Sequence, residues 1–445
     1  NRNVPVRHNI IGLLTEAASV DLASPIFLER SSLRAPGDLP GYQPSNRFPD
    51  PWPGGWWRLR HIIDYEVAFG ESLLGSLVRD RAAYVENALA AAERAMDAVG
   101  AAGEPAAPRA WLLPPDNEDH RALFRLVDIL DRGGVEVHMA KAPFEADGRT
   151  YPEHTVVVLR DQPYGQHVKD LFEVQRYPEG ASPYDVSGWT LPILFGLRRV
   201  EVVGELDADV IEDLAPVDGA ADVLHRMDVG MIPDPMPGTS GYEWQALFGQ
   251  LAAGGQATYR VAGEHVGHFS LGDALDIDPK KDADAENVEL EAMPRIAVYA
   301  PWSGTKNEGW LRWVLDEFGV PFTTLRNEGV RAGALDELFD VIVLPSLGGW
   351  SLDGGRSPGS VPERYERGLD PEGAIALEEF VRGGGRLVTM QSSATWATEL
   401  FDLDLVEVTR GEGDFYCPGS VLRAVPGEGP LAAGLDPSVP IFFSR

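Results

Sequence analysis

Apolar residues near the amino terminus of this chain of 445 residues form one short cluster that is followed by a carboxylate. The cluster consists of Ile10, Ile11, Leu13 and Leu14, and Glu16 stands two residues after it. Short apolar runs that are bounded by small or polar residues are typical of buried strands. The pattern therefore predicts a buried strand that ends at Glu16.

A long helical pattern follows a loop that is rich in proline. The loop spans residues 33–55, and its tryptophans are expected to pack it against the body of the protein. From Leu59 to about Val99 the apolar spacing is that of a helix, with many alanines in its second half. Glycine, alanine and proline then dominate residues 100–108, which predicts a linker.

Beyond the linker, short strands alternate with helices. Residues 110–113 predict a strand, residues 120–130 a helix and residues 135–139 a further strand. Asp116 or Asn117 is expected to cap the helix, because such side chains accept hydrogen bonds from the free amides of a first helical turn. The segment therefore begins an α/β region.

A shorter unit of similar design occurs later in the chain. Residues 246–248 repeat the Ala-Leu-Phe of residues 122–124, and each copy leads to a Gly-Gly pair and then to a strand. The second of these strands is predicted at residues 257–261. The repeat indicates tandem α/β modules over residues 109–290, and a coincidence of composition is the alternative.

The region from residue 294 to the end has the most regular pattern. Strands are predicted at 295–299, 321–325, 340–345 and 386–390, and helices at 308–318 and 373–381. Short apolar strands that alternate with helices are typical of a doubly wound parallel sheet. The predicted fold class of the chain is therefore α/β.

The charge of the chain restricts its partners. It carries 69 acidic and 38 basic side chains, for a net charge of −31, and lysine is scarce. Such a surface is typical of proteins that stay soluble in high salt, and the use of arginine for lysine by a GC-rich genome is the alternative. No basic patch offers phosphate neutralisation, so neither nucleic acid nor an anionic membrane is expected as a partner. The single cysteine, Cys417, allows no internal disulfide, and no apolar run approaches the ~18 residues that span a bilayer.

The segment around Glu16 resembles a catalytic block of an enzyme family. Residues 5–19 follow the pattern Pro-x-Arg-His-Asn-x-x-Gly-x-Leu-Thr-Glu-Ala-Ala-Ser, which is similar to the last catalytic block of bacterial zinc carboxypeptidases of the carboxypeptidase A type. Patches at residues 51–66, 162–163 and 184–192 resemble the same family in the same order. The resemblance implies that Glu16 is a general base that works on zinc-bound water, and that the substrate is a peptide or protein.

Two interpretations of Glu16 follow from its residues alone. A carboxylate that loses solvent at the end of a strand has a raised pKa and can act as a general base near neutral pH. Alternatively, Glu16 is a structural glutamate that is held by an arginine or a backbone amide.

The zinc ligands of that family have no counterpart in this sequence. They come from a His-x-x-Glu pair and a later histidine upstream of the Glu16 block, and a catalytic zinc needs about three protein ligands. None of the nine histidines here is followed by glutamate three residues later. We therefore expect zinc only in the full-length protein, no metal or other cofactor in this chain, and no activity of the chain alone. The chain is expected to be the C-terminal part of a larger secreted or periplasmic enzyme, with any signal peptide upstream of Asn1.

The last region resembles class I glutamine amidotransferase-like domains in the order of its strands and helices. Active members carry a Gly-x-Cys-x-Gly turn after the last of these strands, where this chain has Met-Gln-Ser-Ser-Ala at residues 390–394. Ser392 would take the place of the nucleophile, but a serine needs a base, and the last histidine of the chain is His268. The domain is therefore expected to be inactive.

Three further pairs of possible metal ligands are weak candidates. His265 and His268 have suitable spacing, but a predicted strand over residues 264–271 would place them on opposite faces. The pairs at residues 167 and 170 and at residues 225 and 228 each lack a third ligand, and a surface position is expected for them.

The predicted organisation has three regions. Residues 1–99 form the C-terminal part of a zinc carboxypeptidase domain, residues 109–290 form tandem α/β modules, and residues 294–445 form the amidotransferase-like domain. The predicted function is that of a zinc-dependent metallocarboxypeptidase that hydrolyses C-terminal peptide bonds, with Glu16 as general base. The alternative is a non-catalytic α/β scaffold or binding protein derived from such an enzyme. The sequence leaves the oligomeric state and the side-chain preference for substrates open.

The excess of acidic side chains predicts a fold that salt stabilises. The chain carries 69 acidic against 38 basic groups. Repulsion among the excess acidic groups acts over a Debye length of ~30 Å at 0.01 M salt but of only ~3 Å at 1 M. The melting temperature should therefore rise from low salt to molar NaCl or KCl, by more than for a near-neutral protein of similar size. Thermal scans across that range measure it, and a flat or falling melting temperature would favour genomic drift as the origin of the acidity.

Overall fold

The computed structural model describes most of the chain and contains both helices and strands, in agreement with the predicted α/β class. The described residues are 3–20, 23–35, 37, 39, 41–97, 108–117, 119–174, 190–227, 234–272, 284–407, 420–427, 432, 435 and 437–443. The predicted linker and most of the patch at residues 184–192 lie outside them, as does Cys417. Among the described residues, no helix has the length and apolar character that a membrane crossing needs.

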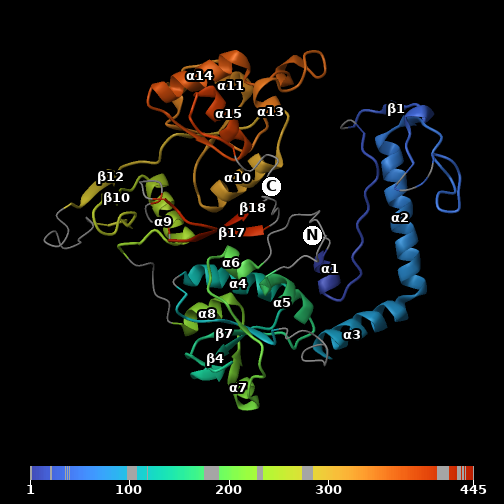
Figure 1. Cartoon of the computed structure of the whole chain (residues 1–445), viewed down its shortest axis with the longest axis vertical. Coiled ribbons are helices and arrows are strands. Elements are labelled where there is room, and N and C mark those ends of the chain that lie inside the picture. Colours follow the sequence, from blue (N-terminus) through green and yellow to red (C-terminus); the bar gives the residue numbers. More distant parts are fainter. Residues whose placement is uncertain are drawn as a thin grey trace.

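The N-terminal elements stand beside the rest of the chain (Figure 1). They are α1 (Asn3–Arg7), β1 (Ile26–Leu28), a short 3-10 helix (Arg30–Ser32), β2 (Gly55–Trp57), α2 (Leu59–Arg79) and α3 (Arg81–Asp97). Strands β1 and β2 pair in antiparallel fashion. The predicted long helix is confirmed but divided, because α2 ends at Arg79, Asp80 forms a turn and α3 begins at Arg81.

These N-terminal elements have almost no core of their own. Among the side chains that the structure describes over residues 3–97, only those of Pro51 and Ala95 are buried, and α2 has no buried residue. The prediction of a buried strand before Glu16 is wrong for this structure, because residues 11–20 have no regular secondary structure. The four apolar side chains of that run are 56–61% exposed, since no described element covers them.

The middle of the chain is built on a five-stranded sheet with the order β8-β3-β7-β4-β9. Its elements are β3 (Ala110–Leu113), α4 (His120–Arg132), β4 (His138–Ala140), β5 (Phe144–Ala146), β6 (Arg149–Tyr151), β7 (Val156–Leu159), α5 (Gly165–Phe172), α6 (Leu191–Leu194), β8 (Val200–Val202), α7 (Ala208–Asp213), β9 (Leu214–Pro216) and α8 (Ala220–Arg226). Neighbouring strands of this sheet run antiparallel.

Burial on both faces explains why all four residues of β3 are apolar. Trp111 and Leu113 face a cluster formed with α4, α5 and α8, whereas Ala110 and Leu112 face a second cluster with β5 and β6. Side chains alternate between the two faces of a strand, so a strand that is covered on both faces loses the polar half of its pattern. Figure 1 shows α4 and α5 on one side of this sheet and α7 on the other.

The cap of α4 differs from the prediction. Asp119 accepts hydrogen bonds from the amides of Arg121 and Ala122, so it caps the helix in place of Asp116 or Asn117. The buried Asn117 instead accepts from the amide of Arg198 at 2.6 Å and braces the loop against the segment before β8.

The repeated helix–Gly-Gly–strand unit exists, but its two copies belong to different sheets. The second copy consists of α9 (Gly241–Ala252) and β10 (Ala257–Ala262). Strand β10 pairs with β11 (Phe269–Ser270) and β12 (Glu286–Leu290) in a separate antiparallel sheet.

The region after residue 294 contains the predicted parallel sheet, with the order β14-β13-β15-β16. Its elements are β13 (Ile296–Tyr299), α10 (Lys306–Glu317), β14 (Thr323–Leu325), α11 (Asn327–Arg331), α12 (Leu335–Leu338), β15 (Val341–Leu344), α13 (Gly349–Asp353), a 3-10 helix (Glu363–Tyr365), α14 (Asp370–Arg382), β16 (Arg386–Thr389) and α15 (Ser392–Leu400). Helices α11, α14 and α15 lie together, with α10 apart from them (Figure 1). Strands β17 (Ser420–Ala424) and β18 (Val439–Phe443) form a separate antiparallel pair, and β18 contacts α6.

One ion pair ties the start of this parallel sheet to its third strand. The Arg295 guanidinium and backbone amide donate to the Asp340 carboxylate, and these hydrogen bonds lower the pKa of Asp340 to about 2. An acid whose pKa is lowered by folding stabilises the fold above its ordinary pKa, and the contribution is lost as the pH falls toward the lowered value.

We therefore predict that Asp340→Asn lowers the melting temperature at pH 7, and that its difference from the parent chain shrinks between about pH 4 and about pH 2. Circular dichroism melts at several pH values measure this. Glu399→Gln on α15 is the matched control, because Glu399 is exposed and has no side-chain partner among the described residues. A difference that stays constant down to pH 2 would contradict the prediction.

Candidate functional site

Glu16 lies on an extended segment that runs beside α2 (Figure 1). The Thr15 hydroxyl donates to Oε2 of Glu66 on α2 at 2.6 Å, and Nε1 of Trp57 donates to the Ala18 carbonyl oxygen at 2.7 Å. Between these two hydrogen bonds, the Glu16 carboxylate is exposed and has no hydrogen-bond or ion-pair partner among the described residues. The loss of solvent that was predicted for Glu16 therefore does not occur here.

Such a carboxylate can accept a proton from a water molecule. It is not held by an arginine or a backbone amide of the described residues, so the structural interpretation of Glu16 finds no partner there. General base catalysis requires a carboxylate within hydrogen-bond reach of the proton that it removes, on a backbone that keeps it in place.

The described residues do not offer a zinc site. They contain no group of three or more His, Cys, Asp or Glu side chains that could hold a metal ion. Because a catalytic zinc needs about three protein ligands, these residues do not fit that metal without contributions from elsewhere.

His265 and His268 lie closer together than predicted. The segment before β11 is a turn and not a strand, and the two rings lie 4.8 Å apart between centroids. Burial lowers the pKa of His268, and the nearby His265 and Arg260 lower it further. The prediction that they point to opposite faces is therefore wrong, although no third ligand joins them among the described residues.

The start of the resembling block attaches the Glu16 segment to the middle region. Arg7 forms an ion pair with Asp170 on α5, with 2.5 Å between Nε and Oδ2. His8 Nε2 donates to the Gly133 carbonyl oxygen at 2.8 Å, and Asn9 Nδ2 donates to the Pro163 carbonyl oxygen at 2.9 Å. Three consecutive side chains therefore anchor the segment.

The partners of this anchor were missed by the sequence. His167 and Asp170 are buried and not on the surface, because α5 presents them toward Arg7 and His8. Burial lowers the pKa of His167 to about 4, helped by His8 and Arg7, so His167 is neutral at pH 7. Burial raises the pKa of Asp170, and Arg7 opposes that change. Their spacing of three residues, which places two side chains on one face of a helix, was the available indication that they lie together.

The turn after β16 differs from the prediction for Ser392. Gln391 occupies the sharp turn, with φ 48° and ψ −115°, and Ser392 is already the first residue of α15. The next residue, Ser393, is buried, donates to the Pro345 carbonyl oxygen at 2.5 Å and accepts from the Leu347 amide at 3.1 Å. In strand–turn–helix sites the nucleophile occupies the strained turn itself. Gln391 and not Ser392 has that position here, and Ser393 holds the loop after β15.

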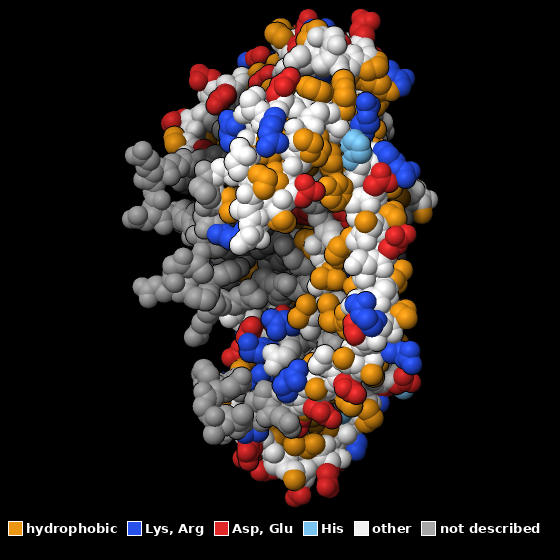
Figure 2. Space-filling view, turned by 90° about the vertical axis from the view of Figure 1, so that its right-hand side faces the viewer, with side chains coloured by type: hydrophobic (Ala, Val, Ile, Leu, Met, Phe, Trp, Pro, Cys, Tyr) orange, Lys and Arg blue, Asp and Glu red, His pale blue; other side chains and the backbone are white. Residues whose placement is uncertain are grey.

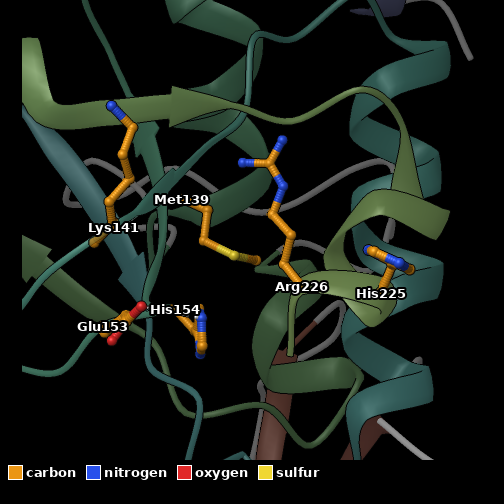
Figure 3. Close-up of a pocket in the computed structure, with 7 residues that line it drawn as sticks. Met139, Lys141, Glu153, His154, His225 and Arg226 are labelled. Carbon is orange, nitrogen blue, oxygen red and sulfur yellow. Dashed lines mark ion pairs between the residues drawn. The ribbon is translucent and has the colours of Figure 1, made fainter. Parts of the chain in front are cut away.

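A hollow of about 390 Å³ lies beside β4 (Figure 3). It is lined by Met139, Ala140, Lys141, Glu153, His154, His225 and Arg226. Its two permanent cations are already paired, Lys141 with Asp213 at 3.5 Å and Arg226 with Asp222 at 2.5 Å. The hollow therefore has no excess of positive charge for an anion.

The apolar surface near Glu16 is the other prominent feature. Figure 2 views the side of the molecule where α2 lies and shows apolar side chains between charged ones. Leu74 and Val78 of α2 are 64% and 70% exposed, and Val85 of α3 is 70% exposed. Exposed apolar side chains that gather in this way are typical of an interaction surface.

The strained turn generates a prediction about stability. A residue other than glycine in such a conformation costs ~1–3 kcal/mol, which glycine avoids. Gln391→Gly should therefore stabilise the chain by roughly 1 kcal/mol in denaturant unfolding, after the entropy of glycine is counted. Glu399→Gly on α15, where the backbone is helical, should instead destabilise it by about 1 kcal/mol. Equal losses in the two variants would contradict the assignment of strain to Gln391.

Comparison of the chain with protein-family models, with curated proteins and with solved structures gives no match. Any functional role for Glu16 therefore depends on its sequence block and on the geometry around it. That geometry is a partner-free carboxylate, among the described residues, between two hydrogen-bonded neighbours.

Proposed function

We propose that this chain supplies the general base of a metallocarboxypeptidase, that Glu16 is this base, and that the zinc ligands come from polypeptide outside the 445 residues. The observation that carries the proposal is the exposed Glu16 carboxylate, which has no partner among the described residues while Thr15 and Ala18 are both hydrogen-bonded. A carboxylate that is free on a fixed backbone is suited to proton transfer.

The reaction is the hydrolysis of the last peptide bond of a peptide or protein. Water adds to the carbonyl carbon, Glu16 accepts the proton that the water loses, and the carbon–nitrogen bond breaks as the amine takes up a proton. The same carboxyl group can return the proton to the leaving amine, as general bases do in hydrolysis.

The exposed apolar side chains support a role for polypeptide outside this chain. The apolar run before Glu16 exposes side chains that a folded domain normally buries, and so does helix α2. Polypeptide that covered them would remove solvent from Glu16, and it could bring metal ligands to the same place.

The second candidate is a non-catalytic α/β scaffold or binding protein. It is favoured by Gln391 at the turn after β16, because a glutamine amide is not a nucleophile, and by the lack of a three-ligand metal group among the described residues. Catalysis by a protein that contains both this chain and the ligands would exclude it.

The test uses a protein in which this chain is joined to the ligand-bearing polypeptide. Glu16→Gln should lower kcat at least ~10²-fold with little change in KM, because it removes the base and keeps the side-chain size. The substrate is an N-blocked dipeptide with a free C-terminal carboxylate, and the same dipeptide with a C-terminal amide is the matched control, which a carboxypeptidase should leave intact.

Full activity of Glu16→Gln would contradict the assigned role. Glu71→Gln, on the exposed surface of α2, is the control for a general effect of removing an acidic charge from this part of the chain.

A further inference from the structure

Two side chains of the second resembling patch, residues 51–66, hold the backbone on either side of Glu16. Glu66 binds the residue before Glu16 through the Thr15 hydroxyl, and Trp57 binds the Ala18 carbonyl two residues after it. We infer that Glu66 and Trp57 are positioning residues, which act through the backbone to fix where the Glu16 carboxylate lies. The inference rests on the proposed role of Glu16.

The bond to Glu66 is short and charge-assisted. Its 2.6 Å between oxygen atoms lies in the range of hydroxyl donors to carboxylates, which are stronger than bonds between neutral groups. Glu66 is on the third turn of α2, so a helix and not a loop carries the acceptor. The neighbouring carboxylate Asp64 does not compete for this role, since it pairs with Arg60.

The bond to Trp57 comes from a side chain that is itself held in place. Trp57 is the last residue of β2 and pairs with Ile26 of β1. Its ring lies 5.4–5.8 Å from three other aromatic rings, those of Trp52, His61 and Tyr65. An indole has one donor, and packing aims it at the Ala18 carbonyl oxygen.

The two bonds matter because little else holds this part of the backbone. Among the described residues, no backbone–backbone hydrogen bond involves residues 11–20. Without Thr15–Glu66 and Trp57–Ala18, the next contacts of the segment toward its start are those of the anchor at Arg7, His8 and Asn9. Misplacement of a catalytic group by about 1 Å can cost ~10²-fold in rate.

NMR relaxation of the backbone amides of the 445-residue chain tests the two bonds without any need for activity, because it reports the motion of a segment whose amides make no backbone hydrogen bonds among the described residues. Thr15→Val removes the donor at nearly constant size, and Trp57→Phe removes the indole N–H and keeps an aromatic ring. Each should lower the NMR backbone order parameters of residues 14–19 toward those of a flexible segment and leave those of β3 unchanged. Thr15→Ser keeps the hydroxyl and should behave like the parent chain, and Glu71→Gln is the control on α2. Order parameters of residues 14–19 that Thr15→Val and Trp57→Phe do not change would overturn the inference.

Kinetics of the protein that also carries the ligands separate positioning from general stability. Thr15→Val and Trp57→Phe should lower kcat about 10-fold or more with little change in KM. In the Glu16→Gln background they should cause no further loss, because their effect passes through Glu16. A loss of the same size in both backgrounds, or unchanged kcat, would overturn the inference while the role of Glu16 stands. Full activity of Glu16→Gln alone would instead overturn the proposed function, and the relaxation data would still report on the two bonds.

Discussion

Hydrophobic burial on both faces of the five-stranded sheet is the interaction on which the N-terminal elements and β18 depend. The clusters around Trp111 and around Leu112 fix β3 and, with it, the helices that cover the sheet. The N-terminal elements reach this body through contacts of α1 and α3 with α5, and β18 reaches it through α6. Elements with little core of their own are thus held by attachment to one that has a full core.

The sequence predicted best those elements whose apolar residues are buried within the described chain. Strands β3, β13 and β15 lie where apolar runs indicated them, because cover on both faces leaves a continuous apolar pattern. The same kind of run before Glu16 was misleading. An apolar run indicates that a segment needs to be buried, but it does not indicate whether the surface that buries it belongs to the described part of the chain.

The local chemistry of loops was harder to predict for a different reason. Asn117 and Asp119 are both good cap residues, and the choice between them depends on Arg198, which is distant in the sequence. His265 and His268 were assigned to opposite faces of a strand, and a turn brings their rings together. The contacts beside Glu16 join residues 51 and 39 positions apart, and no periodicity along the chain records such pairs.

The Gly-Gly pair after α4 does more than end a helix. Gly134 has φ 68°, and a Cβ atom there would lie 2.9 Å from the Tyr164 ring, while one on Gly133 would lie 3.3 Å from the His167 ring. These two rings flank His8, whose bond is to the Gly133 carbonyl. The absence of side chains at these two positions therefore leaves room for the rings of Tyr164 and His167 beside the end of α4. A methyl group added at either glycine would displace a ring that contacts His8 and so change the position of His8. A substitution at the end of α4 would in this way affect a segment that is more than a hundred residues away in the chain.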